Sequence, residues 1–329
     1  MSKPKLALYW AASCGGCEVA VLDLEEKILD VAAFFELVFW PCAMDFKYKD
    51  VEAMGDGAID LCLFNGAVRT SENESMARLM RRKSKLLVAF GSCAMDGCIP
   101  GLANLTTRDE ILRTAYHDTP STIPGANGDP GPRAVVPEGE LELPSFHERV
   151  RTLGQTVPVD YFIPGCPPQP HQIEAVITAV IEGAALPPPG AVLGAGEKSC
   201  CDECGRPRKE KRLKHFYRPW QIEAKPDECL LDQGIICLGP ATRGGCGALC
   251  VKANMPCRGC YGAAPRVRDQ GAKMISALAS VIDSQDPSEI NWTLDQIPDP
   301  AGTFYRFSVP ASLLHSRRGG GQPHAKDHH

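Results

Sequence analysis

Twelve of the sixteen cysteines fall into three groups of four, and one group is scattered over the first half of the chain. Cys14 and Cys17 form a CxxC pair, Cys93 lies in the segment GSCA, and Cys166 lies in PGCPP. Each of these sites follows an apolar run that predicts a β-strand, at residues 5–10, 85–90 and 159–163. The loops after parallel strands emerge at one edge of an open α/β sheet, so we expect the four thiols to converge there.

Two further groups of four cysteines lie close together in the last third of the chain. The first comprises Cys201, Cys204, Cys229 and Cys237. The second comprises Cys246, Cys250, Cys257 and Cys260. Four cysteines stay outside this grouping, namely Cys42, Cys62, Cys98 and Cys200. Cys200 directly precedes Cys201, and the CxxC spacing to Cys204 favours Cys201 as the member of the group.

Groups of four thiolates are typical of zinc sites and of iron–sulfur clusters. CxxC pairs that lie close in sequence occur in structural zinc ribbons, so the last eight cysteines alone leave both interpretations open. The scattered first group favours iron–sulfur, because structural zinc rarely draws its ligands from such distant parts of a chain. Disulfides are less favoured, since the sequence shows no secretory signal and 329 residues can bury a core without cross-links.

Length and charge narrow the protein class further. A chain of this length predicts two domains, or one domain with a large extension. The net charge of −5 does not indicate nucleic-acid binding. The sequence contains no run of eighteen apolar residues, so we expect no membrane-spanning helix. The N-terminus leads directly into the first strand, without a signal peptide or a twin-arginine motif. Together with the many unpaired thiols, these features predict a cytoplasmic protein.

Strand and helix patterns alternate through the N-terminal half, which predicts an α/β fold with a doubly wound parallel sheet. Further strands are expected at residues 34–40 and 58–64, and helices at 18–29, 72–82 and 173–182. Residues 104–157 are less regular and predict a surface insertion. The segment PPPG at 187–190 predicts a linker, after which periodicity fades except for a helix at 272–282. We therefore expect domains at 1–186 and 187–314, and a disordered tail at 315–329.

The cysteine motifs, with their order and their flanking residues, resemble those of the small subunit of nickel–iron hydrogenases. The resemblance rests on Cys14-Gly-Gly-Cys17-Glu18, Gly91-Ser92-Cys93-Ala94, Pro164-Gly-Cys166-Pro-Pro168 and the eight-cysteine segment 201–260. It implies a flavodoxin-like domain that holds a proximal 4Fe-4S cluster on Cys14, Cys17, Cys93 and Cys166. It further implies a mostly irregular domain that holds two more 4Fe-4S clusters, a medial one on the 246–260 group and a distal one on the 201–237 group.

Two details of the motifs indicate a subgroup. Cys201 stands where many periplasmic members have a histidine ligand, and Cys250 supplies a fourth medial thiolate that many of them lack. The pattern resembles the cytoplasmic viologen-reducing group, whose small subunit passes electrons towards a heterodisulfide reductase complex. The resemblance implies an electron relay from H2 oxidation at a nickel–iron centre in a separate large subunit to an iron–sulfur or flavin partner. No complete active site is expected in this chain alone.

Two other protein classes remain as alternatives. A quinone-reductase-like iron–sulfur subunit shares the N-terminal motifs, but such subunits carry one cluster and normally stop near residue 190 of this layout. The eight later cysteines argue against it. The second alternative is a zinc-stabilised binding module without redox activity.

Three features beside the cysteine groups each allow a functional and a structural interpretation. Glu18 follows Cys17 and is either a proton relay or subunit contact, or a carboxylate that stabilises a helix N-terminus. Cys98 follows Cys93 by five residues. In oxygen-tolerant relatives, an extra cysteine near this position modifies the proximal cluster together with a second extra cysteine inside the CxxC pair. Glycines fill that CxxC here, which favours a small buried side chain. The basic run 206–218 is either a docking site for an acidic partner or a solvated surface segment.

Overall fold

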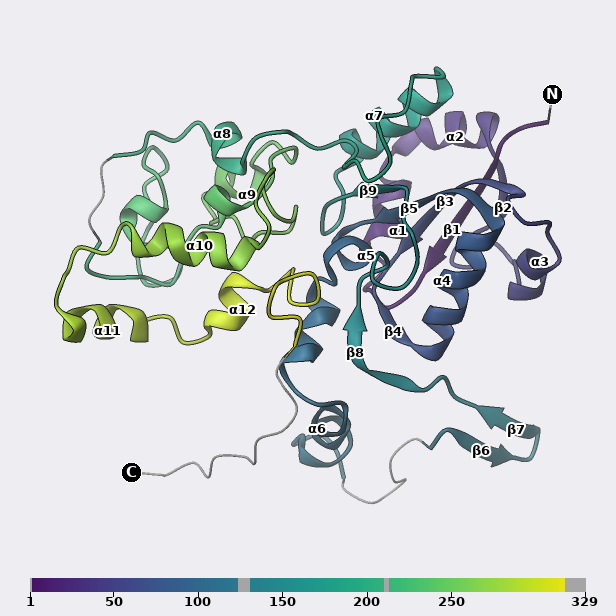
Figure 1. Cartoon of the computed structure of the whole chain (residues 1–329), viewed down its shortest axis with the longest axis horizontal. Coiled ribbons are helices and arrows are strands. Elements are labelled where there is room, and N and C mark those ends of the chain that lie inside the picture. The colour runs from purple at the N-terminus through teal and green to yellow at the C-terminus, as the bar shows by residue number, and fades with distance from the viewer. Residues whose placement is uncertain (1, 124–130, 210–212, 317–329) are drawn as a thin grey trace.

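A computed structural model describes residues 2–123, 131–209 and 213–316. The chain forms two lobes that lie side by side, an α/β lobe from the N-terminal half and a cysteine-rich lobe from the C-terminal half (Figure 1). The described helices include none that is both long enough and apolar enough to cross a lipid bilayer.

A five-stranded parallel sheet forms the centre of the α/β lobe, in the order β2-β1-β3-β5-β9. In sequence order these are β1 (Lys5–Trp10), β2 (Glu36–Phe39), β3 (Ile59–Asn65), β5 (Ser84–Phe90) and β9 (Tyr161–Ile163). Counting only sheet strands, this is the order 2-1-3-4-5 that defines the flavodoxin-like class. The α/β prediction and the flavodoxin-like class are confirmed.

Helices cover both faces of this sheet, because successive residues of a strand point to opposite sides. Leu6 and Leu8 of β1 pack against α1 (Gly16–Leu22), α2 (Ile28–Phe34) and α7 (Pro170–Ile181). Ala7 and Tyr9 belong to the opposite core, with α3 (Tyr48–Glu52) and α4 (Ser71–Lys83). Both faces are therefore buried, and the free edge at the carboxyl ends of the strands is left for ligands.

The prediction of one helix over residues 18–29 is wrong. Helix α1 ends at Leu22, a 3-10 turn spans Glu25–Lys27, and α2 then runs to Phe34. Glu25 adopts φ 54°, a left-handed conformation that interrupts the α-helix. Because α2 continues to Phe34, the second strand begins at Glu36 rather than at residue 34.

The insertion at residues 104–157 contains more regular structure than its sequence predicts. It holds α6 (Arg108–Arg113), a π-helical turn at Thr114–Asp118, β6 (Arg133–Val136), β7 (Gly139–Glu142) and β8 (Phe146–Arg151). Strands β6 and β7 form an antiparallel hairpin that projects away from the lobe (Figure 1). Strand β8 pairs with β4 (Val68–Thr70) outside the main sheet.

The cysteine-rich lobe consists of turns and short helices around the thiols. Its helices are α8 (Cys200–Cys204), α9 (Leu249–Lys252), α10 (Gln270–Ala279), α11 (Pro287–Asp295) and α12 (Pro300–Phe304). The helix predicted at 272–282 is thus present as α10, shifted by two to three residues. A separate apolar core includes Met274, Leu278 and Phe304.

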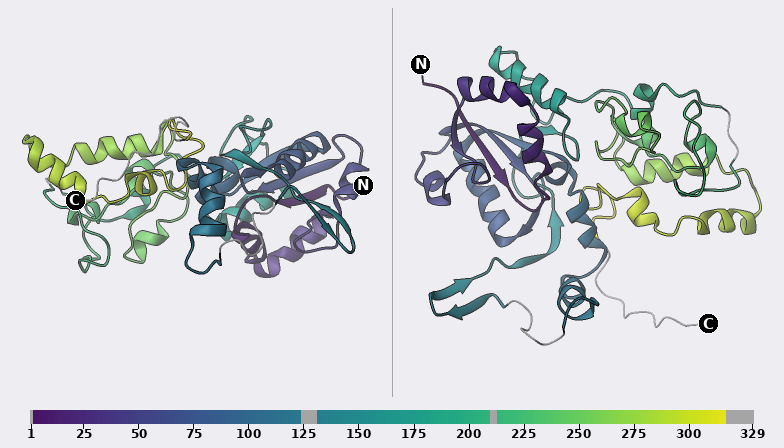
Figure 2. Two further views of the ribbon diagram at one scale, coloured as in Figure 1. Left: turned by 90° about the horizontal axis from the view of Figure 1, so that it is seen from below. Right: turned by 180° about the vertical axis from the view of Figure 1, so that it is seen from behind.

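The C-terminal segment after α12 returns to the junction between the two lobes, where it appears in yellow (Figure 2). The backbone N–H of Cys98 donates to the carbonyl of Phe307 at 3.1 Å, and the Asn104 amide donates to the carbonyl of His315 at 3.0 Å. A Cβ at Gly97 would lie 2.3 Å from Cγ of Pro310. These contacts fix the second lobe against the loop that follows Cys93. Residues 317–329 of the predicted tail lie outside the described residues.

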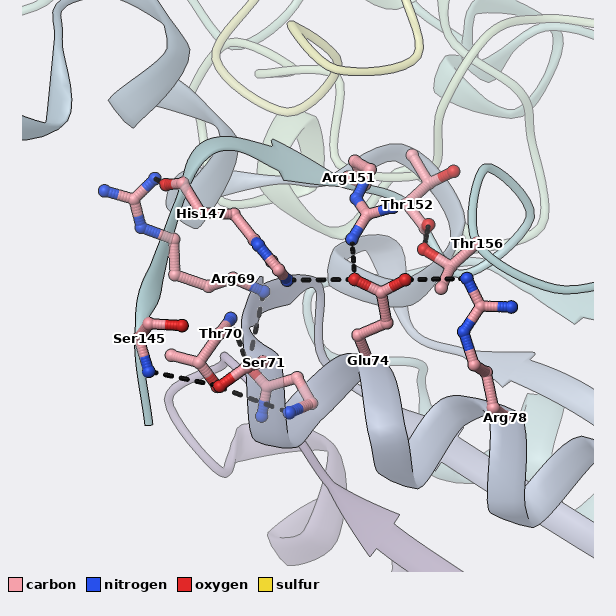
Figure 3. Close-up of polar contacts among 11 residues, drawn as sticks. Arg69, Thr70, Ser71, Glu74, Arg78, Ser145, His147, Arg151, Thr152 and Thr156 are labelled. Atoms are coloured by element: carbon pink, nitrogen blue, oxygen red, sulfur yellow. Dashed lines mark hydrogen bonds and ion pairs between the residues drawn. The ribbon is translucent and has the colours of Figure 1, made fainter. Parts of the chain in front are cut away.

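An ionic cluster around Glu74 attaches strand β8 to helix α4 (Figure 3). The Glu74 carboxylate accepts from Arg78 Nη2 at 2.7 Å and from Arg151 Nη2 at 2.5 Å, and His147 Nε2 lies 3.1 Å away. Hydrogen bonds from the two arginines lower the pKa of Glu74 to about 2. The stabilisation is therefore complete above the ordinary glutamate pKa and is lost only as the pH falls towards about 2.

We expect Glu74→Gln to loosen β8 at pH 7, because the amide cannot hold both guanidinium groups. The expected loss is about 1 kcal/mol, since the network is partly exposed to water. Hydrogen exchange of residues 146–151 should be faster in this variant, whereas Glu52→Gln, at an exposed carboxylate on α3, should leave it unchanged. Equal exchange in the wild type and Glu74→Gln would contradict a structural role for the network.

Candidate iron–sulfur sites

The scattered cysteines come together where the sheet strands end. Cys14 lies in the loop after β1, Cys17 in the first turn of α1, Cys93 in α5 (Ser92–Asp96) after β5, and Cys166 in the loop after β9. Burial raises the pKa of Cys17, and the nearby thiols of Cys93, Cys166 and Cys14 raise it further. A group of thiols that oppose one another's ionisation is suited to a cationic iron centre, which would stabilise the thiolates.

Glycines allow these loops to approach one another closely. Gly91 follows β5 at φ 83°, and a Cβ there would lie 2.3 Å from Sγ of Cys17. Gly165 adopts φ 132°, and a Cβ there would lie 2.5 Å from Cα of Pro168. The motifs GSCA and PGCPP therefore require glycine for two physical reasons, a left-handed backbone and the absence of a side chain.

Cys98 is a fifth thiol at this site. It is fully buried, its Sγ lies 3.7 Å from Sγ of Cys166, and it also contacts the thiol of Cys93. The hydrogen bond from Cys98 lowers the pKa of Cys166 to about 7, and the same contact raises the pKa of Cys98. The interpretation of Cys98 as a small buried side chain describes its burial but misses its contact with two of the four cysteines.

The distal group lines a cavity of about 240 Å³ in the second lobe. All four of its cysteines line the cavity, together with Cys200, Arg206, Arg208 and Lys209. Gly239 forms part of the wall, since a Cβ there would lie 2.9 Å from Sγ of Cys201 and 3.7 Å from Sγ of Cys237. The cavity is thus lined by sulfur on several sides and shaped by a glycine that keeps it open.

The medial group lies between the other two. The thiol of Cys260 interacts with those of Cys257, Cys246 and Cys250, and also with that of Cys166 in the first lobe. On the other side, the backbone N–H of Cys257 donates to Sγ of Cys237 at 3.3 Å. The hydroxyl of Ser92, next to Cys93, donates to the carbonyl of Cys260. These contacts arrange the three groups in the order proximal, medial, distal.

Backbone N–H groups point at many of these sulfurs, as iron–sulfur sites require for charge stabilisation. Gly16 N–H donates to Sγ of Cys14 at 3.4 Å. N–H groups of Ala248 and Leu249 lie against Cys246, and that of Gly259 lies against Cys257; each lowers the pKa of its thiol. Among the described residues, no three cysteine, histidine, aspartate or glutamate side chains are placed to share a single metal ion.

Two of the remaining cysteines lie away from the three groups. Cys62 is buried within β3 in the sheet core, and burial raises its pKa to about 12. Cys42 is exposed after β2. The structure thus places neither of them at a predicted site.

Glu18 is buried beside the proximal group rather than at an open helix end. Its carboxylate accepts hydrogen bonds from Nε1 of Trp40 and, at 3.5 Å, from Nδ2 of Asn65. Burial raises the pKa of Glu18. The helix-capping interpretation is not supported, because the carboxylate is held by side chains from the ends of β2 and β3. Sequence reasoning misses Trp40 and Asn65, although Trp40 ends the strand predicted at 34–40 and Asn65 directly follows the one predicted at 58–64.

The basic run 206–218 divides into parts with different roles. The Arg206 guanidinium donates to the carbonyls of Lys225, Glu228 and Val251 and to Oδ1 of Asn254, at 2.8 to 3.2 Å. Arg206 is therefore a structural residue of the cysteine-rich lobe. Lys209 pairs with Glu228 at 3.6 Å and remains mostly exposed. Residues 210–212 lie outside the described residues.

A half-buried arginine lies beside the medial and distal groups. Burial lowers the pKa of Arg258, and nearby Arg306 and Arg218 lower it further, while the thiols of Cys237 and Cys250 raise it. None of these three arginines forms an ion pair with a carboxylate elsewhere in the described residues. The positive charge of Arg258 thus acts on a thiol from each of the two groups.

Comparison with known proteins assigns the family. The family described as NADH ubiquinone oxidoreductase, 20 Kd subunit, matches residues 14–180, which is about half of the chain and includes all four proximal cysteines. An iron–sulfur subunit of the F420-non-reducing hydrogenase of Archaeoglobus profundus is 43% identical over 319 residues, covering 95% of this chain and 98% of the relative. The chain belongs to the family of F420-non-reducing hydrogenase iron–sulfur subunits.

A second member of this hydrogenase family, from Methanothermobacter marburgensis, is 36% identical and covers 95% of this chain and 96% of the relative. A chain in the crystal structure of an NAD+-reducing [NiFe]-hydrogenase in the H2-reduced state is 28% identical. The matched region covers 57% of this chain and 97% of the hydrogenase chain, and the TM-score is 0.49. The resemblance to the viologen-reducing group of nickel–iron hydrogenases is confirmed, and the chain is one component of an oxidoreductase.

Gly91→Ala should remove the proximal group's capacity to bind iron, because the added methyl group would collide with Cys17. We expect a loss of about four irons per chain with the other sites intact. Iron analysis of the anaerobically purified complex measures this loss directly. Gly55→Ala is the matched control, since a Cβ at Gly55 meets no atom within 4 Å. Full iron content in Gly91→Ala would contradict the proposed position of the cluster.

Proposed function

We propose that this chain relays electrons from H2 oxidation, at a nickel–iron site in a partner large subunit, through three 4Fe-4S clusters. The observation that supports it most is the serial order of the three cysteine groups. Cys166 and Cys260 connect the first to the second, and Cys257 and Cys237 connect the second to the third. A zinc-binding module without redox activity has no need for such a row of adjoining sites.

Each cluster would supply one-electron transfer at a potential set by its surroundings. The ligands are proposed to be Cys14, Cys17, Cys93 and Cys166 at the proximal site. They are Cys246, Cys250, Cys257 and Cys260 at the medial site, and Cys201, Cys204, Cys229 and Cys237 at the distal site. The protein contributes N–H groups directed at sulfur, apolar walls that exclude water, and the charge of Arg258 beside the second and third sites.

The large subunit is proposed to cover the face around the proximal group. Cys14 is exposed there, and the apolar side chains of Trp10, Val19 and Leu22 are 42%, 55% and 56% exposed. An apolar surface of this kind is typical of a subunit interface. Glu18 lies buried just behind it with a raised pKa, so it can hold a proton at neutral pH more readily than an exposed glutamate. We propose Glu18 as a proton-relay residue between the two subunits.

Electrons are proposed to leave at the distal cavity, where Arg208 and Lys209 lie at the rim. The acceptor would be an iron–sulfur or flavin protein, such as a heterodisulfide reductase complex, and we place the whole assembly in the cytoplasm.

In this proposal residues 1–186 form the proximal-cluster domain, 187–314 form the domain of the other two clusters, and 315–329 form a tail. A quinone-reductase-like role remains the second candidate, because the family description that covers residues 14–180 names such an enzyme.

Metal and sulfide analysis tests the relay most simply. The purified complex should contain about twelve irons and about twelve acid-labile sulfides in this chain, because each of three four-thiolate sites holds four of each. The nickel–iron centre must be counted separately, from the nickel content. A stoichiometric amount of zinc would support the binding module, and about four irons would support the quinone-reductase-like role.

Exchanging Lys209 and Lys214 for glutamate should slow electron transfer to the natural acceptor, because exposed charges guide the encounter of redox partners. The effect should shrink as salt is added, and reduction of a small viologen dye should be nearly unchanged. Lys49→Glu, at an exposed site on α3, is the control for a change of charge elsewhere. Equal loss of both activities would show that these lysines support the cluster lobe and do not dock a partner.

A further inference from the structure

Ser92 lies at the junction between the two lobes and directly precedes the proximal cysteine Cys93. It is the first residue of α5, which stands on the side of the α/β lobe that faces the cysteine-rich lobe (Figure 1). A serine near the start of a helix commonly uses its hydroxyl to cap the first turn. Helix α5 has no such side-chain cap, and Ser92 is only 1% exposed. The buried hydroxyl therefore makes its hydrogen bonds elsewhere.

The hydroxyl of Ser92 joins three of the cysteine motifs. Its O–H donates to the carbonyl of Cys260 in the medial group, and its oxygen accepts from the N–H of Gly165 at 3.2 Å. Gly165 directly precedes Cys166, and the N–H of Ser92 donates to the carbonyl of Gly165 at 2.8 Å. Two proposed proximal ligands are thus connected to one hydroxyl, and that hydroxyl is connected to a proposed medial ligand.

These contacts form a short path between the two sites. From Cys93 the path follows the backbone to Ser92, passes through that side chain, crosses one hydrogen bond and reaches the backbone of Cys260. Electronic coupling decreases more slowly along covalent and hydrogen bonds than across an empty gap. A path of this kind therefore favours electron transfer between the sites that it joins.

Other hydrogen bonds between the lobes give longer paths. The N–H of Gln169 donates to the hydroxyl of Tyr261 at 3.4 Å, but this path runs through two prolines and a phenol side chain. Nε2 of His171 lies 3.2 Å from the carbonyl oxygen of Gly245, and His171 is still farther along the chain from the proximal cysteines. Ser92 offers a more direct connection than either.

We propose that Ser92 carries the electronic connection between the proximal and medial clusters, because its hydroxyl joins the backbone at Cys93 and Cys166 to the backbone at Cys260. The inference rests on the proposed clusters at these two sites. One electron passes from the reduced proximal site to the oxidised medial site, and the hydroxyl keeps its proton. No bond of Ser92 forms or breaks. Ser92 is a positioning residue, since it acts through the cysteine ligands.

The test compares Ser92→Ala with the wild type in the complete anaerobic hydrogenase complex. EPR of the reduced complex separates the exchange interaction between neighbouring clusters, which reports electronic overlap, from the dipolar interaction, which reports their distance. Ser92→Ala should keep its iron and the dipolar interaction, whereas the exchange interaction between the proximal and medial clusters should fall severalfold. After rapid mixing with H2, reduction of the medial cluster should also be slower in this variant.

Two comparisons control for the loss of a buried group. Ser308 is 6% exposed, and its hydroxyl has no hydrogen-bond partner among the described residues, so Ser308→Ala should change neither interaction. Ser92→Thr and Ser92→Val form a second pair, because both side chains are β-branched and only threonine keeps the hydroxyl. The threonine variant should retain a larger exchange interaction than the valine variant.

Several outcomes would overturn the inference. An unchanged exchange interaction in Ser92→Ala, or equal values in Ser92→Thr and Ser92→Val, would show that electrons follow another path. A parallel fall of the exchange and dipolar interactions would make Ser92 a contact that holds the lobes together instead. If Ser92→Ala loses its iron, the threonine and valine pair decides. Failure of all three variants to bind iron would assign Ser92 to assembly of the sites and contradict its role in transfer. Zinc or too little iron in the wild type would refute the proposed function itself, which is a separate result.

Discussion

The convergence of parallel strand ends is the constraint on which the rest of the molecule depends. Three strands of one sheet end at the same edge, and the loops and first helical turns that follow them carry Cys14, Cys17, Cys93 and Cys166. The sheet keeps these loops in place because helices bury both of its faces. The loops meet only because Gly91 and Gly165 leave room for their neighbours. A thiol site built this way has a rigid base, and the second lobe can be attached to it.

The second lobe has a different physical basis. Its helices are short, and five of its cysteines belong to the same apolar cluster as Leu230 and Val251 or pack against it. Bound metal commonly supplies folding energy where a core is small. The polypeptide also contributes its own fixed contacts, such as those of Arg206 with four backbone and side-chain oxygens. The C-terminal segment then closes the junction, since Phe307 and Pro310 pack on the loop beyond Cys93.

Sequence patterns predict the sheet well because strand ends and cysteine motifs coincide. The first strand has its predicted bounds, and the four proximal cysteines lie in the segments that follow β1, β5 and β9, as expected, although Cys17 and Cys93 stand in the short helices α1 and α5. The left-handed residue Glu25 could not be foreseen, because nothing in a glutamate indicates a break in a helix. The β6–β7 hairpin escapes prediction since its strands are short and lie apart from the core. The side chains around Glu18, and the thiols of Cys98 and Cys200, depend on tertiary contacts between distant segments and leave no local pattern.

The serial arrangement of the three groups can be measured by EPR of the fully reduced complex. Neighbouring reduced clusters should interact magnetically, so the proximal and distal signals should both be broadened by a medial cluster between them. Cys257→Ala, which removes a medial ligand, should sharpen both signals once the medial spin is lost. The proposed relay predicts this simultaneous sharpening. Broadening that survives the loss of the medial cluster would contradict it, because the proximal and distal groups would then be direct neighbours.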